Sequence, residues 1–384
     1  MISITKLLCG QSSFGDELRY KQGLTQNQER RPIVVWNVTR TCNLSCIHCY
    51  SDSCNKRYSD ELTTSEAKKM LVSLAKFKVP VVLFSGGEPL LRKDIFQLNS
   101  FAKGLGLRTV FSTNGTLITR RLASRIKEQA VDYAGVSLDG IGLHNDRFRG
   151  KKGAFDLALS GIRNLVAVGQ KVGLRFTITR HNYPDLKLIF KLAEDENINR
   201  VCFYHLVYAG RGSSMYEDDL TAPKMRQCID AICAWALELN KKGQAKEILT
   251  VDNHSDGVYI YLKLKKKNPE KAKEVLELLR YNAGNSSGIG IANIDHRGFV
   301  HPDQFWQSDS FGNIRERDFG ELWLDTKNSL MSKLKNRKPC LKGRCARCKF
   351  LSLCNGNFRI RAQAAYNDIW QEDPACYLTE DEIS

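Results

Sequence analysis

Short apolar runs alternate with amphipathic helical segments from residue 33 to residue 208, and this alternation constrains the fold more than any other feature of the chain. The apolar runs cover residues 33–39, 79–85, 107–113, 133–138, 173–179 and 200–208. The helical segments cover residues 64–77, 94–103, 119–129, 154–168 and 183–195. Parallel strands joined through helices wind in a right-handed sense. Six such units fall short of the eight of a closed barrel. The pattern therefore predicts an α/β fold, a partial (β/α)6 barrel of the TIM type.

The alternation ends near residue 210, which predicts a change of architecture. Helical patterns follow at 222–242 and 269–281, and a stretch rich in Gly, Asn and Ser at 282–290 precedes a new β-like section. We predict four regions: an N-terminal extension (1–30), the partial barrel (31–212), a helical linker or substrate-covering region (213–290) and a C-terminal domain (291–384).

Cysteine content and charge bound the environment and the partners. The 13 cysteines are odd in number and mostly fall into two tight groups, which favours metal ligation in a reducing compartment over disulfides. No apolar run approaches the roughly 18 residues of a membrane-spanning helix. We therefore expect a cytoplasmic protein, monomeric, with no membrane partner. The net charge of +16 is scattered along the chain, so we expect a small polyanionic substrate and no nucleic acid.

The first thiol group consists of Cys42, Cys46 and Cys49, spaced C-x3-C-x2-C directly after the first apolar run. Thiolates are the usual ligands of iron–sulfur clusters, normally four for a [4Fe–4S] cluster. Three thiolates on one loop leave one iron without a protein ligand, so a small molecule can bind there. On spacing alone, a zinc site is the alternative.

Polar groups recur where the next apolar runs end. Ser85–Pro89 (SGGEP) follows the second run, Ser112–Gly115 the third and Val136–Gly140 the fourth, while Arg175 lies on the fifth. Barrel enzymes carry their chemistry at the carboxyl ends of the strands. We therefore expect these groups beside the first thiol group. The glycines permit close backbone approach, and Glu88 can accept a hydrogen bond from an ammonium group.

The first thiol group together with the Gly-Gly-Glu-Pro motif resembles the radical S-adenosylmethionine (SAM) superfamily. The resemblance implies a [4Fe–4S] cluster on the three cysteines, with the methionine part of SAM on the open iron. One electron then splits SAM and yields a 5′-deoxyadenosyl radical, which abstracts a hydrogen atom from the substrate. It also implies that Gly86, Gly87 and Glu88 hold the amino group of SAM. Ser137 and Arg175 would hold its carboxylate, and Thr113 and Asn114 its nucleoside.

The second thiol group consists of Cys345, Cys348, Cys354 and Cys376. It resembles the C-terminal SPASM or twitch-type domain of many radical SAM enzymes, which implies a second, auxiliary [4Fe–4S] cluster. Structural zinc is the alternative, because four thiolates suit either metal. Cys340 either replaces one of the four or is a free thiol, and we leave it out of the group.

Further segments resemble the tetrapyrrole-modifying enzymes of the alternative haem pathway and of haem d1 synthesis, nearly from end to end. They cover residues 31–37, 203–212, 249–257, 303–306 and 354–361. The resemblance implies an iron-tetrapyrrole substrate and an external one-electron donor such as ferredoxin or flavodoxin. It favours removal of two acetate side chains from 12,18-didecarboxysiroheme, giving iron-coproporphyrin III. Removal of propionates from the same substrate is the alternative.

Three residues at or after the end of the sixth run are candidates for substrate contact. Arg211 could hold a carboxylate bidentately, and His205 or Tyr208 could bind the iron of the tetrapyrrole. A hydrogen-bonded core histidine is the alternative for His205.

Two other functions compete with this interpretation. A peptide maturase would usually need a leader-binding module, for which residues 1–30 are too few. A redox or scaffold protein with two clusters would have no use for a SAM site.

Overall fold

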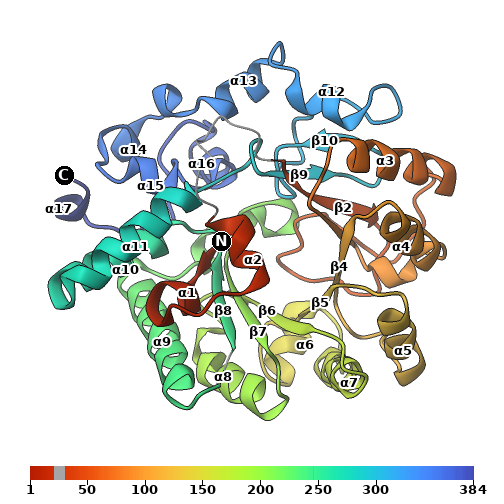
Figure 1. Cartoon of the computed structure of the whole chain (residues 1–384), viewed down its shortest axis with the longest axis horizontal. Helices are drawn as coiled ribbons and strands as arrows, with labels where there is room; N and C mark the ends of the chain where they lie inside the picture. The colour runs from red at the N-terminus through yellow and green to blue at the C-terminus, as the bar shows by residue number, and fades with distance from the viewer. Residues whose placement is uncertain (21–30, 245) are drawn as a thin grey trace.

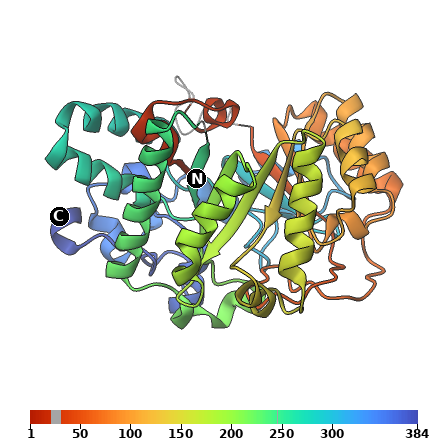
Figure 2. The same cartoon turned by 90° about the horizontal axis from the view of Figure 1, so that it is seen from below.

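The described part of the chain forms one curved sheet of ten strands, and helices pack around its outer side (Figures 1 and 2). The structure is a computed structural model, and it describes residues 1–20, 31–244 and 246–384. The strand order is β1-β8-β7-β6-β5-β4-β3-β2-β9-β10. The strands are β1 (Ile2–Ser3), β2 (Ile33–Thr39), β3 (Val81–Gly86), β4 (Arg108–Thr113), β5 (Tyr133–Ser137), β6 (Val172–Ile178), β7 (Arg200–His205), β8 (Glu247–Val251), β9 (Ile291–Ile294) and β10 (Val300–His301).

The helices fall into those that cover the sheet and those that follow it. The first set is α1 (Ile4–Cys9), α2 (Phe14–Arg19), α3 (Thr64–Lys76), α4 (Ile95–Gly104), α5 (Arg120–Glu128), α6 (Leu143–Arg149), α7 (Ala154–Ala167), α8 (Leu186–Asp195) and α9 (Ala222–Lys241). The second set is α10 (Ser255–Lys267), α11 (Pro269–Asn282), α12 (Phe319–Leu324), α13 (Ser329–Lys335), α14 (Gly343–Arg347), α15 (Leu351–Cys354), α16 (Arg359–Tyr366) and α17 (Glu380–Ile383).

Each central strand has two buried faces of different character. On β2, Val34 and Trp36 pack into the core beneath the helices, while Ile33 and Val35 line the lumen enclosed by the sheet. This division follows from the period of two along a strand, which sends successive side chains to opposite faces. The outer face is almost wholly apolar because it must bury the helices. The lumen face can therefore carry polar groups without weakening the main core.

The six predicted strands correspond to β2–β7, all parallel to their neighbours. The sheet extends further than the six predicted strands. In the region predicted to be helical, β8 pairs in parallel with β7. At the other edge β9 pairs in parallel with β2, and β1 closes against β8 in antiparallel fashion. Short apolar runs such as β8 have too few residues to separate strand from helix by periodicity.

The predicted region boundaries therefore divide one continuous sheet. The first strand after residue 290 belongs to the same sheet as the barrel, and so does the pair of residues in β1. The boundaries themselves stay a prediction, and residues 21–30 of the predicted N-terminal extension lie outside the described residues. Within the described ranges, no helix combines the length and apolarity needed to cross a membrane.

Candidate active site

The lumen of the sheet contains a cavity of about 690 Å³, large enough for a cofactor-sized ligand. Its wall is built from the inward-facing positions of β2–β8. At the carboxyl ends of these strands the cavity reaches His48 and Tyr50 of the loop after β2, together with Ser85 of β3 and Ser137 of β5. This end of the cavity therefore adjoins the first thiol group.

The first thiol group is gathered in one small cluster. Cys42 and Cys46 are buried beside Leu44 and Ala154, and Cys49 packs against them. The pKa of Cys42 is raised to about 12, mainly by burial and to a lesser extent by the neighbouring Glu88, Cys46 and Cys49. Three adjacent thiols, two of them buried, ionise together only if a cation offsets the charge that their thiolates would bring together. The site is thus suited to a cationic metal cluster.

The cysteine loop is held against the barrel by its own backbone. Gly87 donates to the carbonyl oxygen of Thr39 (2.8 Å), and Glu88 donates to that of Thr41 (2.9 Å). A Cβ atom on Gly86 would lie 2.2 Å from the Thr39 carbonyl oxygen, and Gly86 also has φ of +119°. Only glycine fits there without moving the loop. The glycines thus permit close approach of backbone to backbone, where we had expected approach to a ligand.

The side chain of Glu88, the next residue, is fully buried. Its carboxylate accepts hydrogen bonds from Thr113 Oγ1 (2.8 Å) and from the backbone of Asn114 (2.8 Å) and Leu90 (3.1 Å). Burial raises its pKa to about 7. We had expected the side chain to accept from an ammonium group, but its oxygens are already occupied by the protein. Its role is therefore to fix the loops after β3 and β4.

Asn114 connects that carboxylate to the first thiol group. Its side-chain nitrogen donates to Asn43 Oδ1 (2.9 Å) and lies 3.9 Å from Cys42 Sγ. Its side-chain oxygen accepts from the backbone and hydroxyl of Thr116. Thr113 and Asn114 are therefore brought beside the cysteines as predicted, but their side chains serve the packing of the loops.

Ser137 and Arg175 face the cavity from neighbouring strands. They stand opposite each other in the β5–β6 register, and both line the lumen. The guanidinium of Arg175 bonds to the hydroxyl of Ser112 and lies over Gly135, where a Cβ atom would be 2.4 Å from its Nε. That Nε is buried and has no hydrogen-bond partner in the structure. A carboxylate in the lumen could accept from it.

Three residues that sequence analysis did not select complete the environment of Cys46. Arg149 donates to Cys46 Sγ (3.6 Å) and pairs with the buried carboxylate of Asp139. His48 Nε2 lies 3.5 Å from the same carboxylate. Asp139 lies in the segment Val136–Gly140, which follows the fourth apolar run. Arg149 had no local signal, because it lies about a hundred residues from the thiol it contacts.

The candidate substrate residues are placed differently from one another. His205 lines the cavity, and its ring bonds to Asp256 (2.9 Å) and lies 3.4 Å from Asn253 Nδ2. Tyr208 is buried and donates to Asp219 (2.7 Å). Arg211 donates to the carbonyl oxygens of Cys46 (2.8 Å) and Ser53 (2.9 Å).

Arg211 was a candidate to hold a substrate carboxylate, but its guanidinium donors are engaged by carbonyl oxygens of Cys46 and Ser53. The Cys46 carbonyl also accepts from the backbone N–H of Cys49 (3.3 Å). Tyr208 likewise packs in a separate apolar cluster with Phe148, Leu206 and Met215. Of the three candidates, His205 alone is among the described residues that line the lumen.

The second thiol group is also brought together by the fold. Burial raises the pKa of Cys354, and the nearby thiols of Cys345, Cys376 and Cys348 add to the effect. Cys376 approaches from the C-terminal segment, where its sulfur accepts from the hydroxyl of Ser255 (3.4 Å). The four predicted ligands therefore form one set. No comparable interaction with Cys340 is resolved in the described residues.

The thiol groups differ from a site for a single metal ion. Among the described residues, no three His, Cys, Asp or Glu side chains converge tightly enough to hold one metal ion. A cluster of four irons separates its thiolates more widely than a single ion does. Both thiol groups, mutually close and at least partly buried, fit the donor set of such clusters.

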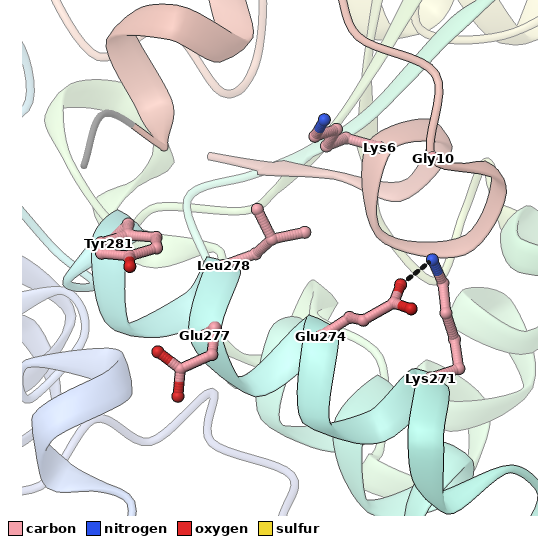
Figure 3. Close-up of a pocket in the computed structure, with 7 residues that line it drawn as sticks. All are labelled: Lys6, Gly10, Lys271, Glu274, Glu277, Leu278 and Tyr281. Atoms are coloured by element: carbon pink, nitrogen blue, oxygen red, sulfur yellow. Dashed lines mark hydrogen bonds and ion pairs between the residues drawn. The ribbon is translucent and has the colours of Figure 1, made fainter.

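A second cavity lies away from both thiol groups. It has a volume of about 450 Å³ and opens between α1 and α11 (Figure 3). Lys271 and Glu274 of α11 form an ion pair along its edge (2.6 Å), and Lys6 and Tyr281 also line it. None of the predicted site residues contributes to this surface.

Comparison with known proteins identifies the class. The model of the radical SAM superfamily matches residues 36–193, which span β2–β6 and the first thiol group. A full-length relative, described below, extends the relationship over the whole chain. The chain belongs to the radical SAM superfamily. It is therefore an enzyme that uses a [4Fe–4S] cluster and SAM.

More specific relatives share nearly the whole chain. Fe-coproporphyrin III synthase of Methanosarcina barkeri is 53% identical over 100% of this chain and 99% of that protein. Pre-heme d1 synthase of Dinoroseobacter shibae is 43% identical over 91% of this chain and 87% of that protein. Among solved structures, Streptococcus suis SuiB bound to S-adenosylmethionine has a TM-score of 0.71, covering 91% of this chain and 78% of that one at 17% identity. The last similarity concerns the fold alone.

Proposed function

We propose that this enzyme removes two acetate side chains from 12,18-didecarboxysiroheme and so produces iron-coproporphyrin III. The observation that carries the proposal is the 53% identity with Fe-coproporphyrin III synthase, which runs through both thiol groups and the lumen between them. The cavity in the lumen supports it, because this cavity adjoins the loop of the first thiol group at His48 and Tyr50. On its other side the cavity reaches Gly284, whose Cβ position lies against the backbone of Cys354.

The first thiol group would hold the cluster that receives SAM. The bound cluster and SAM supply the 5′-deoxyadenosyl radical that abstracts a hydrogen atom from the substrate. Arg149 would stabilise the thiolate of Cys46 through its hydrogen bond and positive charge. Arg211 would hold the loop in place through the carbonyl oxygens of Cys46 and Ser53.

Ser137 and Arg175 would bind the carboxylate of SAM. Both face the lumen, and Arg175 has an unpartnered buried Nε. Glu88 and Asn114 would act as positioning residues, because they connect the Gly-Gly-Glu-Pro loop to Cys42 and leave their oxygens engaged by the protein. The amino group of SAM would then meet backbone atoms of Gly86 and Gly87.

The second thiol group would hold an auxiliary [4Fe–4S] cluster beside the same lumen. Its position suits electron exchange with a substrate in the cavity or with an external one-electron donor. The iron-tetrapyrrole itself would occupy the lumen, whose apolar wall residues Val35, Leu83 and Val110 suit a flat macrocycle.

The test is mass spectrometry of the tetrapyrrole after anaerobic incubation with SAM, a reductant and 12,18-didecarboxysiroheme. Loss of two acetates establishes the proposal. Loss of propionates would instead assign the enzyme to haem d1 synthesis, the activity suggested by its 43% identity with pre-heme d1 synthase. SAM cleavage with an unchanged tetrapyrrole would overturn both.

A further inference from the structure

We propose that the amino-terminal mouth of the lumen binds the peripheral carboxylates of the tetrapyrrole through Arg31, Lys78 and Lys171. The inference rests on the proposed function and extends it to how the substrate is held. The cavity runs the length of the lumen: it reaches the cysteine loop at one end, and at the other end it is lined by residues where the strands begin. One cavity therefore joins the cysteine loop to a second opening at the amino ends of the strands.

The amino-terminal mouth is strongly basic. Amino ends of parallel strands meet at one edge of a sheet, so residues that precede or begin β2, β3, β4, β6 and β7 surround a common opening. Helix α2 lies over the same opening at the centre of Figure 1 and contributes to its lining. Among the described residues that line this end, Glu17 and Asp132 are acidic, whereas six are basic: Arg19, Arg31, Lys78, Arg108, Lys171 and Arg200.

Half of these cations are already neutralised by the protein. Arg19 (2.9 Å) and Arg200 both pair with Glu247, and Arg108 lies 3.7 Å from Asp132 while covering the ring of Phe14. Such pairs hold α2 and the strand ends together. They leave little charge for a ligand.

The other three cations form the proposed site. Within the described ranges no carboxylate lies at ion-pair distance from Arg31, Lys78 or Lys171, and Arg31 instead lies 4.3 Å from the centre of the Phe77 ring. Lys78 and Lys171 are exposed at the opening. A cluster of uncompensated cations at a cavity mouth attracts polyanions and repels cations.

The spacing of the three cations suits a flat ligand with several carboxylates around its edge. Neighbouring strands lie about 4.8 Å apart, so the starts of β3 and β6, three strands apart, are separated by roughly 14 Å along the sheet. A ligand with carboxylates spread around its edge could meet Arg31, Lys78 and Lys171 at the same time. A macrocycle held at this mouth would direct its opposite edge along the apolar wall toward the cysteine loop.

The experiment measures binding of tetrapyrroles without turnover. Iron-coproporphyrin III, which carries four carboxylates, and iron-protoporphyrin IX, which carries two, are titrated against the cluster-loaded protein by visible absorption. The charge-reversed double variant Lys78→Glu/Lys171→Glu is compared with Lys267→Glu, an exposed residue at the end of α10 that does not line the cavity. Iron content and thermal unfolding report whether each variant is folded.

We expect the double variant to weaken binding of iron-coproporphyrin III at least tenfold and to reduce its dependence on salt, with a smaller loss for iron-protoporphyrin IX. Lys267→Glu should bind both as the wild type does. If the double variant binds iron-coproporphyrin III as tightly as the wild type, the mouth is not the carboxylate site and the proposed function stands. If the wild type binds neither compound, the inference fails, while the turnover assay with 12,18-didecarboxysiroheme still decides the proposed function. Should the double variant unfold, Lys78→Gln/Lys171→Gln and Arg31→Gln test the same loss of charge.

Discussion

The two thiol groups of this enzyme are built in opposite ways. The first lies on one loop of eight residues, and the barrel holds that loop through backbone contacts to Gly87 and Glu88 and through the side chain of Arg211. The second is assembled from a short helical segment, Cys345 to Cys354, and from Cys376 near the C-terminus. One set is local in sequence, whereas the other depends on tertiary packing.

This difference suggests different tasks. Three thiols in a loop at the carboxyl ends of the strands would leave one iron of a bound [4Fe–4S] cluster without a protein ligand, as SAM cleavage requires. Four thiols close their set and leave no position for a substrate. The packing around the second group is correspondingly rigid, since Arg361 and Asp373 form a fully buried ion pair (2.8 Å) that also ties the segment to backbone carbonyl groups of Leu206 and Asp252.

Removal of one thiol from the first group should have the largest effect. Cys49→Ala should abolish SAM cleavage, because two thiolates cannot hold the cluster in the orientation that leaves an iron open to SAM. The measurement is 5′-deoxyadenosine formation under anaerobic, reducing conditions. Cys340→Ala is the matched control and should retain wild-type formation. Continued formation of 5′-deoxyadenosine by Cys49→Ala would show that the three cysteines are not the site.

Removal of one thiol from the second group should impair tetrapyrrole conversion without stopping SAM cleavage. Cys354→Ala should lower the iron content from about eight to about four per chain and suppress tetrapyrrole conversion, while SAM cleavage persists. Iron analysis and mass spectrometry of the tetrapyrrole measure the two effects. Full iron content with full turnover would mean that the second group binds no cluster.

Arg211→Ala tests whether the first loop depends on its anchor. The variant removes the charged donor from the carbonyl groups of Cys46 and Ser53, at a cost of about 1–3 kcal/mol for Ser53 and less for Cys46, which keeps the backbone N–H of Cys49. We expect faster loss of iron from the first group and a raised KM for SAM. Arg211→Lys should rescue little, because one ammonium group cannot reproduce the planar fork. Unchanged iron retention would mean that the glycine contacts hold the loop alone.

Glu88→Gln should give the smallest effect and one that depends on pH. Burial raises the pKa of Glu88 to about 7 in the folded protein, against about 4.3 in an unfolded chain. The folded state therefore binds the proton more tightly, and Glu88 costs stability as pH rises from about 4.3 to 7. The neutral amide removes this pH-dependent cost, although its NH2 group cannot accept the hydrogen bonds that one Glu88 oxygen accepts.

The measurement is thermal unfolding of the cluster-free protein between pH 5 and 8. The stability of Glu88→Gln relative to that of the wild type should be lowest at pH 5 and highest at pH 8. Parallel curves for the two proteins would show that the carboxyl group is not the source of the pH dependence.

The sequence by itself determined the features that depend on local periodicity and spacing. The alternation of apolar and amphipathic segments predicted β2–β7 within one or two residues at most ends, because strand and helix periods are intrinsic to the backbone. The spacing of Cys42, Cys46 and Cys49 identified the first thiol group, since all three lie on one loop. The Gly-Gly-Glu-Pro motif was correctly placed beside them.

Only the tertiary structure decided which atoms of these motifs are free. Glu88 points away from the lumen because a buried carboxylate must be hydrogen-bonded, and the strand ends supply Thr113 and Asn114 for that purpose. Arg211 joins the cysteine loop and Arg149 reaches Cys46 across about a hundred residues of chain, contacts that no local pattern encodes. The charged mouth likewise arises only when the beginnings of separate strands meet at one edge of the sheet.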